Sequence, residues 1–388
     1  MTGPLAGIRV LDLSRLLPGG FCSLLLADFG AEVLKVEDTG AGDYLRWTPP
    51  HHDGADPSAS SAPFVALNRG KRSIRLDLKH ERGREVLLRL ARSHDVLLES
   101  FRPGVLDRLG VGYGVLRVAN PGLVYCAITG YGQEGPDRDR PGHDVNYLAR
   151  NGVLALSGER DGPPVIPAVQ VADLGGGGLM AAFAIMAALW ERERSGEGQV
   201  VDVAMTAASQ RWLAMVTAAM LAGGPPPRRG GLDLAGARPC YRVYRCADGW
   251  VALGALEPKF WEVLCDGIGR PDLRGRQSDP AVAAELEPVF AARTRAEWAA
   301  FADAHPCCLE PVLELEEALE RMPGAVVDVE QPGCGSVRVL GAPFGMSRTP
   351  ARDTRPAPAL GEHTGAVLGE LGYDADEVAA LEHAGAVA

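Results

Sequence analysis

Short apolar segments alternate with amphipathic ones through the first 130 residues, and this alternation limits the possible folds more than any other feature. Strands are expected at 8–13, 32–37, 73–78, 95–99 and 123–129, with helices at 21–29 and 84–90. Strands separated by helices of this length favour right-handed βαβ units and a mostly parallel sheet covered on both faces. We therefore expect an α/β protein whose large domain is Rossmann-like.

The rest of the chain predicts a second, smaller domain. Helices are expected at 144–156, 173–193 and 205–221, a strand at 199–204, and then a Gly/Pro-rich linker at 223–231. A hairpin at 241–253 and helices at 259–268 and 295–305 indicate a small α+β domain. We expect a large domain at 1–205 completed by about 330–388, a helix and linker at 206–230, the small domain at 231–325, and a return segment with a C-terminal tail at 326–388.

The net charge, the apolar segments and the cysteine pattern restrict the kinds of molecule that we expect this chain to bind. The chain has 388 residues and a net charge of −11, which argues against nucleic acid or an anionic membrane as the main partner. The longest apolar run, 179–190, is shorter than the roughly 18–20 residues that span a bilayer. Its eight cysteines show no zinc-ligand spacing, so we expect reduced thiols, a cytoplasmic location and no metal.

One segment runs against the acidic balance of the chain. Residues 68–93 hold nine Lys/Arg and three Asp/Glu. A phosphate-bearing ligand could bind there, and a solvated basic helix face would have the same composition. Charge alone leaves both interpretations open.

The first strand–turn–helix has one feature of a dinucleotide site. Glu37 ends the second strand, where such sites place a ribose-binding acid. The turn at 16–20 reads LLPGG, however, and contains no G-x-G-x-x-G motif. A plain βαβ unit is therefore the favoured interpretation.

Two later segments carry the strongest chemical signals. The sequence RPGHDVNY at 140–147 places His143 and Asp144 at an expected helix start, where backbone N–H groups can stabilise an anion. The alternative is that Asp144 caps the helix and His143 is a turn residue. Asp173 begins the long apolar helix and precedes four glycines, which indicate close approach to a ligand or to another helix, and Asp173 could itself be a helix cap.

Several segments together resemble the family III CoA-transferase and α-methylacyl-CoA racemase group, and within it the racemase branch. They lie at 4–37, 67–73, 99–105, 129–133, 254–260, 360–364 and 370–373, so the resemblance covers nearly the whole chain in order. It implies the α/β fold of that superfamily and an interlocked homodimer. It also implies a site that combines a large domain with the small domain of the partner chain.

The resemblance also implies roles for single residues. Transferases of the group carry an aspartate nucleophile where this chain has Asp144, whereas racemases place a histidine before it, as His143 is here. The second racemase base falls on Asp173, and two further active-site residues fall on Glu257 and Arg108. These matches imply an acyl-CoA racemase or epimerase, which inverts the α-carbon through an enolate by two-base proton transfer.

Other activities remain open on the same residues. Asp144 would be the nucleophile of a CoA-transferase, and other α-proton chemistry or a non-catalytic acyl-CoA-binding protein would also fit. Coenzyme A would be part of the substrate in each case, with neither a metal nor a prosthetic group.

We expect the CoA contacts to come mainly from the basic segment and from two loops. The candidate residues are Arg69, Lys71, Arg72, Arg75, Arg102, Gly130, Tyr131, Asn146 and Tyr147. Four positions depart from the racemase pattern, namely Val169, Arg238, Cys240 and Arg242. The added arginines predict an acyl group that is more polar than a simple branched chain.

Overall fold

A computed structural model describes residues 3–54, 56–352 and 354–388 and divides the chain into two compact units. The first unit combines 1–151, 167–212 and 323–388, and the second combines 152–166 and 213–322. Segments 152–166 and 213–230 belong to the same unit, in which Gly158 packs against Arg229 and Gly230 packs against Arg160. The domain boundaries expected from the sequence stay a prediction.

A six-stranded sheet forms the centre of the first unit. Its order is β3 (Arg72–Arg75), β2 (Glu32–Glu37), β1 (Arg9–Asp12), β4 (Val96–Glu99), β5 (Val124–Thr129) and β6 (Val200–Ala204). Every neighbouring pair is parallel, so the Rossmann-like prediction is confirmed. The strand order reverses between β1 and β4, and in open α/β sheets ligands bind in the crevice beyond the carboxyl ends of strands at such a point.

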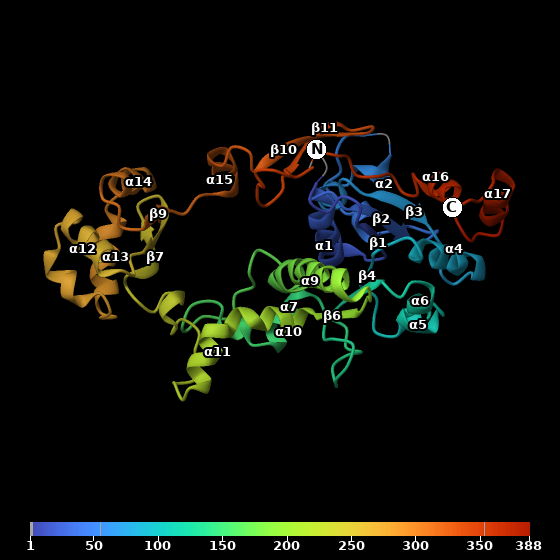
Figure 1. Cartoon of the computed structure of the whole chain (residues 1–388). Helices are drawn as coiled ribbons and strands as arrows, with labels where there is room; N and C mark the ends of the chain where they lie inside the picture. The colour runs from blue at the N-terminus through green and yellow to red at the C-terminus, as the bar shows by residue number, and fades with distance from the viewer. Residues whose placement is uncertain (1–2, 55, 353) are drawn as a thin grey trace. The chain divides into compact units, whose positions relative to one another are not determined.

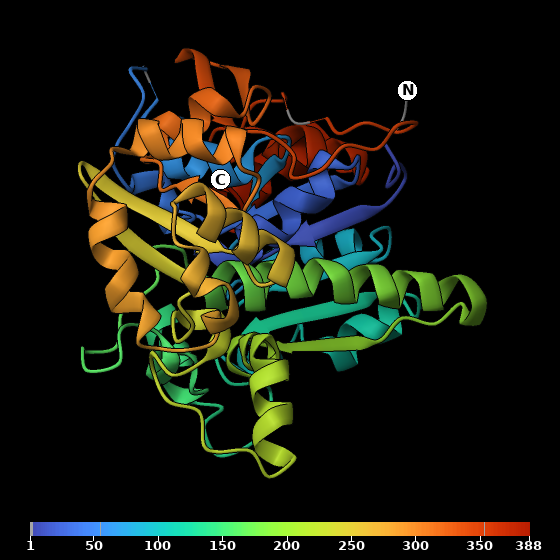
Figure 2. The ribbon, with the colours of Figure 1, turned by 90° about the vertical axis from the view of Figure 1, so that its left-hand side faces the viewer.

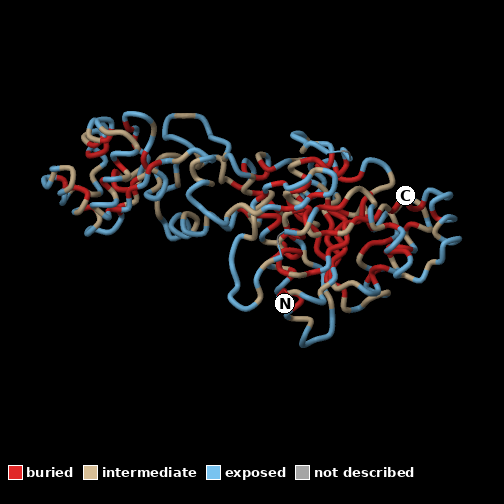
Figure 3. Tube along the Cα trace, turned by 90° about the horizontal axis from the view of Figure 1, so that it is seen from above, coloured by how far each residue is buried: buried red, intermediate tan, exposed pale blue. Residues whose placement is uncertain are grey.

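Helices cover both faces of this sheet (Figure 1). One face packs against α4 (Glu81–Ala91), α5 (Val105–Arg108), α6 (Tyr113–Ala119), α16 (Thr364–Glu370) and α17 (Ala375–His383), which share one buried core with the strands. The helix α1 (Leu16–Asp28) contacts β1, β2 and β4 outside that core. Figure 3 shows this burial as red trace inside the first unit. The short elements η1 (Tyr44–Trp47), α2 (Pro57–Ser60) and α3 (Ala62–Asn68) follow β2. Of these, η1 and α3 form a smaller core with the hairpin β10 (Val326–Gln331) and β11 (Gly335–Leu340).

The expected long helix begins as a π-helix, η2 (Val171–Leu179), and continues as α9 (Met180–Ser195). Helix α9 runs along β5 and β6 (Figure 2). Its preceding glycines allow close packing, because a Cβ on Gly178 would lie 2.8 Å from the carbonyl oxygen of Pro18. By length and composition alone the stretch Val171–Ser195 could cross a membrane, but buried core helices pass the same test.

Two other expected helices are interrupted. The helix expected at 144–156 divides into α7 (Asp144–Arg150) and α8 (Val153–Leu156), because Gly152 between them adopts a φ of +88°. The helix expected at 205–221 divides into α10 (Met205–Gln210), η3 (Arg211–Leu213) and α11 (Ala214–Leu221).

The second unit has its own sheet and core. The hairpin β7 (Tyr241–Cys246) and β8 (Gly249–Gly254) is confirmed, and β9 (Leu309–Pro311) adds an antiparallel strand that the sequence did not predict. Its helices are α8, α11, α12 (Pro258–Gly267), α13 (Val282–Ala291), α14 (Arg295–Ala304) and α15 (Leu315–Arg321), with the short turns η4 (Asp233–Ala235) and η5 (Pro271–Arg276). Trp261, Phe290 and Trp298 are fully buried at its centre.

Candidate active site

A cleft of about 520 Å³ lies in the first unit where β1, β4 and β5 end, which is the crevice expected from the strand order. Both predicted bases, His143 and Asp173, line it. The other lining residues are Arg15, Leu16, Pro18, Ser100, Phe101, Arg102, Pro103, Ile128, Thr129, Gly130, Arg138, Arg140, Pro141, Gly142, Asn146, Tyr147 and Met205. Residues 30 positions apart in the sequence therefore share one cleft.

His143 is the residue that immediately precedes α7. Its backbone N–H donates to Asn146 Oδ1 at 3.0 Å, and its carbonyl accepts from the Asn146 N–H at 2.8 Å. These two bonds fix the backbone of His143, and its exposed side chain lines the cleft. Asn146 therefore has a defined role in holding the histidine.

Asp144 is placed differently from its neighbour. Its side chain is buried, with 8% exposure, and Oδ1 accepts the N–H groups of Ala172 at 2.6 Å and Asp173 at 2.9 Å. Asp144 is absent from the cleft lining within the described residues. Its carboxylate therefore ties the start of α7 to the start of η2, and this tie brings Asp173 to the cleft.

Asp173 is partly buried, and this raises its pKa to about 6. The charge of Asp144 also raises that pKa, and the nearby His143 lowers it. Asp173 lies inside η2, which Gln170 precedes as the N-cap, so Asp173 is not the helix cap that the sequence allowed as an alternative. A carboxyl group with a pKa close to neutrality is suited to proton transfer.

An aromatic pair forms the wall behind His143. The Tyr147 hydroxyl donates to the Gly142 carbonyl at 2.5 Å, and its ring packs edge-on against Tyr131 with centroids 5.3 Å apart. A Cβ on Gly130 would lie 2.5 Å from the Tyr147 ring, so this position requires glycine. Burial raises the pKa of Tyr147 to about 12, and the phenol therefore stays protonated.

The charged groups of the basic segment have internal partners. Arg69 forms a buried ion pair with Asp28, and Lys71 Nζ donates to Ser23 Oγ at 2.7 Å and pairs with Asp12 at 3.3 Å. Arg72 pairs with Glu370 at 2.8 Å, and Arg75 donates to backbone carbonyls at 39 and 40. None of these four residues lines the cleft, and phosphate binding by this segment stays a prediction.

The cations of the cleft instead come from three loops. Arg15 follows β1, Arg102 follows β4, and Arg138 and Arg140 precede His143. Only Arg102 was predicted from the sequence. The others could have been found from their places after a strand end or before the histidine. The predicted Arg108 is exposed and does not line the cleft, and its guanidinium would lie 3.2 Å from a Cβ on Gly104.

Other sequence candidates lie elsewhere. Glu257 is an exposed residue of the second unit and precedes α12. The Glu37 carboxylate accepts the Nε–H of Arg46 at 2.8 Å and a terminal N–H of the same guanidinium at 2.6 Å. Glu37 therefore has a structural partner and does not serve as a ribose-binding acid. Among the described residues, no group of three or more His, Cys, Asp or Glu side chains could hold a metal ion.

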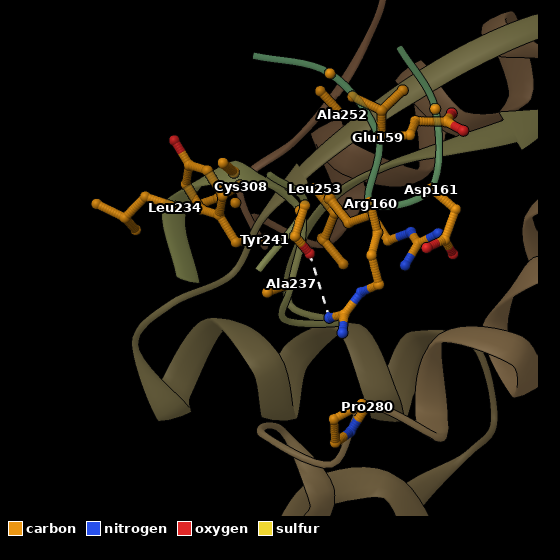
Figure 4. A pocket seen from close by; sticks show the side chains of 18 of the residues that line it. Glu159, Arg160, Asp161, Leu234, Ala237, Tyr241, Ala252, Leu253, Pro280 and Cys308 are labelled. Atoms are coloured by element: carbon orange, nitrogen blue, oxygen red, sulfur yellow. Dashed lines mark hydrogen bonds between the residues drawn. The ribbon is translucent and has the colours of Figure 1, made fainter. Parts of the chain in front are cut away.

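The second unit contains a larger cleft, of about 1160 Å³, between the loop 158–162 and the strands β7 and β8. Arg160 crosses it and donates to the Gly230 carbonyl at 3.3 Å (Figure 4). Of the four departures from the racemase pattern, only Arg242 lines this cleft. Arg238 pairs with Asp233 on the surface, Cys240 is buried, and Val169 is exposed. The two arginines therefore do not form one acyl pocket.

Comparison with known proteins gives a consistent result. The sequence profile of CoA-transferase family III matches residues 5–364. Human alpha-methylacyl-CoA racemase is 38% identical over 96% of this chain and 95% of its own. Succinate–glutarate CoA-transferase from Agrobacterium fabrum is 37% identical over 95% of this chain and 96% of its own. A crystal structure of a CaiB/BaiF family protein from Brucella suis superposes with a TM-score of 0.84 at 31% identity, covering 96% of this chain and 100% of that one.

Proposed function

This chain belongs to CoA-transferase family III and is an enzyme, and we propose that it racemises or epimerises the α-carbon of an acyl-CoA thioester. The substrate is a CoA thioester, and the reaction needs neither a prosthetic group nor a metal. His143 and Asp173 are the two bases. One removes the α-proton from one face and the other returns a proton to the opposite face.

The observation that carries this proposal is the difference between His143 and Asp144. A racemase needs two proton-transfer groups at one cleft, and His143 and Asp173 both line it. A transferase needs a free carboxylate nucleophile. Here Oδ1 of Asp144 accepts two backbone N–H groups, and the side chain is buried. The geometry favours proton transfer over acylation of Asp144.

The charges around the cleft suit the intermediate. Removal of the α-proton places negative charge on the thioester oxygen, and positive groups aimed at such developing charge lower the barrier. Four arginines supply positive charge at the cleft: Arg102 has no carboxylate partner among the described residues, whereas Arg15, Arg138 and Arg140 each pair with an aspartate. The same groups can attract the phosphates of coenzyme A.

We further propose that the active unit is an interlocked homodimer in the cytoplasm. In it, Glu257 of the partner subunit would complete the site and orient His143. Two observations support this proposal: Glu257 is exposed on the second unit and so is free to meet a partner, and all eight cysteines are free thiols, as in cytoplasmic proteins.

Co-refolding His143→Ala chains with Glu257→Ala chains should give heterodimers more active than either mutant homodimer. Heterodimers that form without recovery of activity would contradict the shared site.

The CoA-transferase alternative is kept because transferases of the family are similar to this chain over nearly its whole length. The decisive measurement is exchange of the α-proton of acyl-CoA thioesters in heavy water, followed by NMR. His143→Ala should lower exchange by about 10²–10⁴-fold. Asp144→Asn should lower it modestly, since the amide oxygen can still accept an N–H.

A transferase would show the opposite order, with hydroxylamine-sensitive covalent labelling lost in Asp144→Asn and little effect of His143→Ala. Melting curves and a CoA-binding measurement on both variants exclude loss of fold as the cause. An inactive Asp144→Asn beside a near-normal His143→Ala would overturn the racemase proposal.

A further inference from the structure

Leu16 has an unusual backbone conformation for its residue type. Its φ is +62°, and within the described residues only one other non-glycine residue, Cys308, has a positive φ. A branched L-residue rarely adopts this left-handed region, because its Cβ approaches the following carbonyl oxygen. Leu16 lines the cleft and keeps 36% of its surface exposed. Such strain persists only where surrounding contacts hold it.

A buried ion pair supplies those contacts. The Leu16 N–H donates to Asp43 Oδ1 at 3.1 Å, and Asp43 Oδ2 pairs with Lys35 Nζ at 2.8 Å. Lys35 Nζ also donates to the Ser14 carbonyl at 2.9 Å. One ion pair therefore holds the chain on both sides of Arg15, and neither of its side chains is more than 1% exposed.

The pair is itself held in place. The Asp43 N–H donates to Glu37 Oε1 at 3.0 Å, and the Leu45 N–H donates to Asp43 Oδ1 at the same distance. Burial alone would lower the pKa of Lys35, but Asp43 and Asp12 raise it above its ordinary value, so the ammonium stays charged. A buried ion pair is weak evidence for stability, since desolvation offsets its attraction, but it fixes geometry well.

We propose that Lys35 and Asp43 are positioning residues that hold Leu16 in its left-handed conformation, so that the leucine side chain forms part of the apolar lining of the catalytic cleft. Glycine would adopt this φ without any clamp. A leucine held there by a buried ion pair indicates that the side chain itself is used. Beside the four cleft arginines, it gives the uncharged part of an acyl-CoA a surface to contact. That last step rests on the proposed function.

The test combines two substitutions at Asp43 with one at Leu16. Asp43→Ala removes the acceptor and should lower kcat/KM for α-proton exchange by about tenfold, the factor expected when a conformer strained to this degree is released. Asp43→Asn keeps an acceptor for the Leu16 N–H but removes the charge that pairs with Lys35, so it should recover part of that loss. In a Leu16→Gly background, Asp43→Ala should lower kcat/KM by less than about threefold, since glycine adopts this φ without the Lys35–Asp43 pair.

A matched control lies at the opposite edge of the sheet. Asp95 also accepts one backbone N–H, from Arg9 at 2.7 Å, and pairs with one cation, Arg192, at 2.9 Å. Asp95→Asn should lower the melting temperature while leaving kcat/KM within about twofold of the wild-type value. Equal losses of kcat/KM for Asp43→Ala with Leu16 and with glycine at position 16 would overturn the proposal. So would an Asp43→Asn variant as poor as Asp43→Ala.

Two further measurements keep the test decisive if Asp43→Ala does not fold or if the proposed function fails. Leu16→Gly alone should raise the melting temperature and weaken acetyl-CoA binding, and a lower melting temperature or unchanged binding would overturn the clamp. If the wild-type chain exchanges no α-proton of any acyl-CoA, the proposed function fails by itself. The coupling between positions 16 and 43 is then read from melting temperatures and acetyl-CoA affinity.

Discussion

Two arginine-lined clefts lie at opposite edges of the same sheet in the first unit. The cleft at the carboxyl edge contains Arg15, Arg102, Arg138 and Arg140 together with His143 and Asp173. The cleft at the amino edge is larger, about 830 Å³, and contains Arg9, Arg72, Arg89, Arg92 and Arg355. Both are rich in the same cation, and only one holds a histidine beside an aspartate with a perturbed pKa.

The arginines of the amino-edge cleft contact partners within the fold. Arg72 pairs with Glu370, Arg9 with Glu32, and Arg89 lies over the Tyr373 ring at 4.4 Å. The helices α4 and α16 also end at this cleft, and cations stabilise helix C-termini. Arginine density therefore does not identify a functional site in this protein. The strand order favours the carboxyl edge, because ligands of open α/β sheets bind beyond the carboxyl ends of the strands where the order reverses.

Removing one carboxylate at each edge of the sheet should give the largest difference between the two clefts in the rate of α-proton exchange. Asp173→Asn should lower α-proton exchange by about 10²–10⁴-fold, because it removes a proton-transfer group. Glu370→Gln should leave exchange within about twofold, since it only weakens an exposed ion pair with Arg72. A comparable loss in the two variants would contradict the assignment of catalysis to the carboxyl edge.

The pH dependence should also belong to the carboxyl edge. In the direction in which Asp173 accepts the proton, kcat/KM should fall about tenfold per pH unit below its pKa of about 6. The raised pKa means that the folded state favours the protonated acid. This contribution to stability is fully present below pH 3.8 and is lost as the pH rises through about 6. A rate profile that stays flat down to pH 5, in protein that melting curves show to be folded, would rule out Asp173 as this base.

Tight packing behind the cleft should make glycine substitutions there costly. Gly178→Ala should lower the free energy of unfolding by about 1–3 kcal/mol, because its Cβ would lie 2.8 Å from a backbone oxygen. Gly365→Ala in α16 meets no atom within 4 Å and should stabilise by about 0.5–1 kcal/mol. Denaturant unfolding measures both values. A neutral Gly178→Ala would show that η2 and α1 can separate freely.

The smallest expected effect concerns Glu99 at the end of β4. Burial raises its pKa to about 7, while bonds from the Phe101 N–H and the Tyr125 hydroxyl lower it in part. The folded state therefore favours the protonated acid, so this stability is lost as the pH rises from about 4.5 to about 7. Glu99→Gln should remove this step, which we expect to amount to a few degrees in melting temperature. If wild type and variant show parallel melting profiles over that pH range, Glu99 does not titrate there.

Much of the fold could be predicted because its signals are local. The segment 32–37 coincides with β2, and the other strands of the first sheet differ from expectation by three residues or fewer. The interruption at Gly152 could not be predicted, since whether a glycine adopts a positive φ depends on its tertiary contacts. The hairpin of β10 and β11 was missed within a segment described only as a return to the large domain.

The site shows the same limit. His143 and Asp173 were identified from the resemblance, and both line one cleft, while their roles as bases stay a prediction. The roles of Arg69, Lys71 and Asp144 depended on partners that composition cannot show. Arg69 meets Asp28, Lys71 meets Asp12, and the Asp144 carboxylate meets N–H groups 28 and 29 positions later. The sequence shows where charged side chains occur. Whether such a side chain is exposed depends on a partner far away in the sequence, which the sequence pattern does not identify.

The division of the first unit into three separated segments affects how the protein is made. Val367, Leu368, Leu381 and Val387 belong to the same buried core as Leu11 and Leu34. On the ribosome, the strands near the N-terminus emerge long before these partners. The second unit has a separate core between residues 240 and 309. It can therefore fold before the last helices that cover the large sheet have been synthesised. Until those helices are made, the apolar face of the sheet has no cover, and transiently exposed apolar surface makes partly folded chains prone to aggregation.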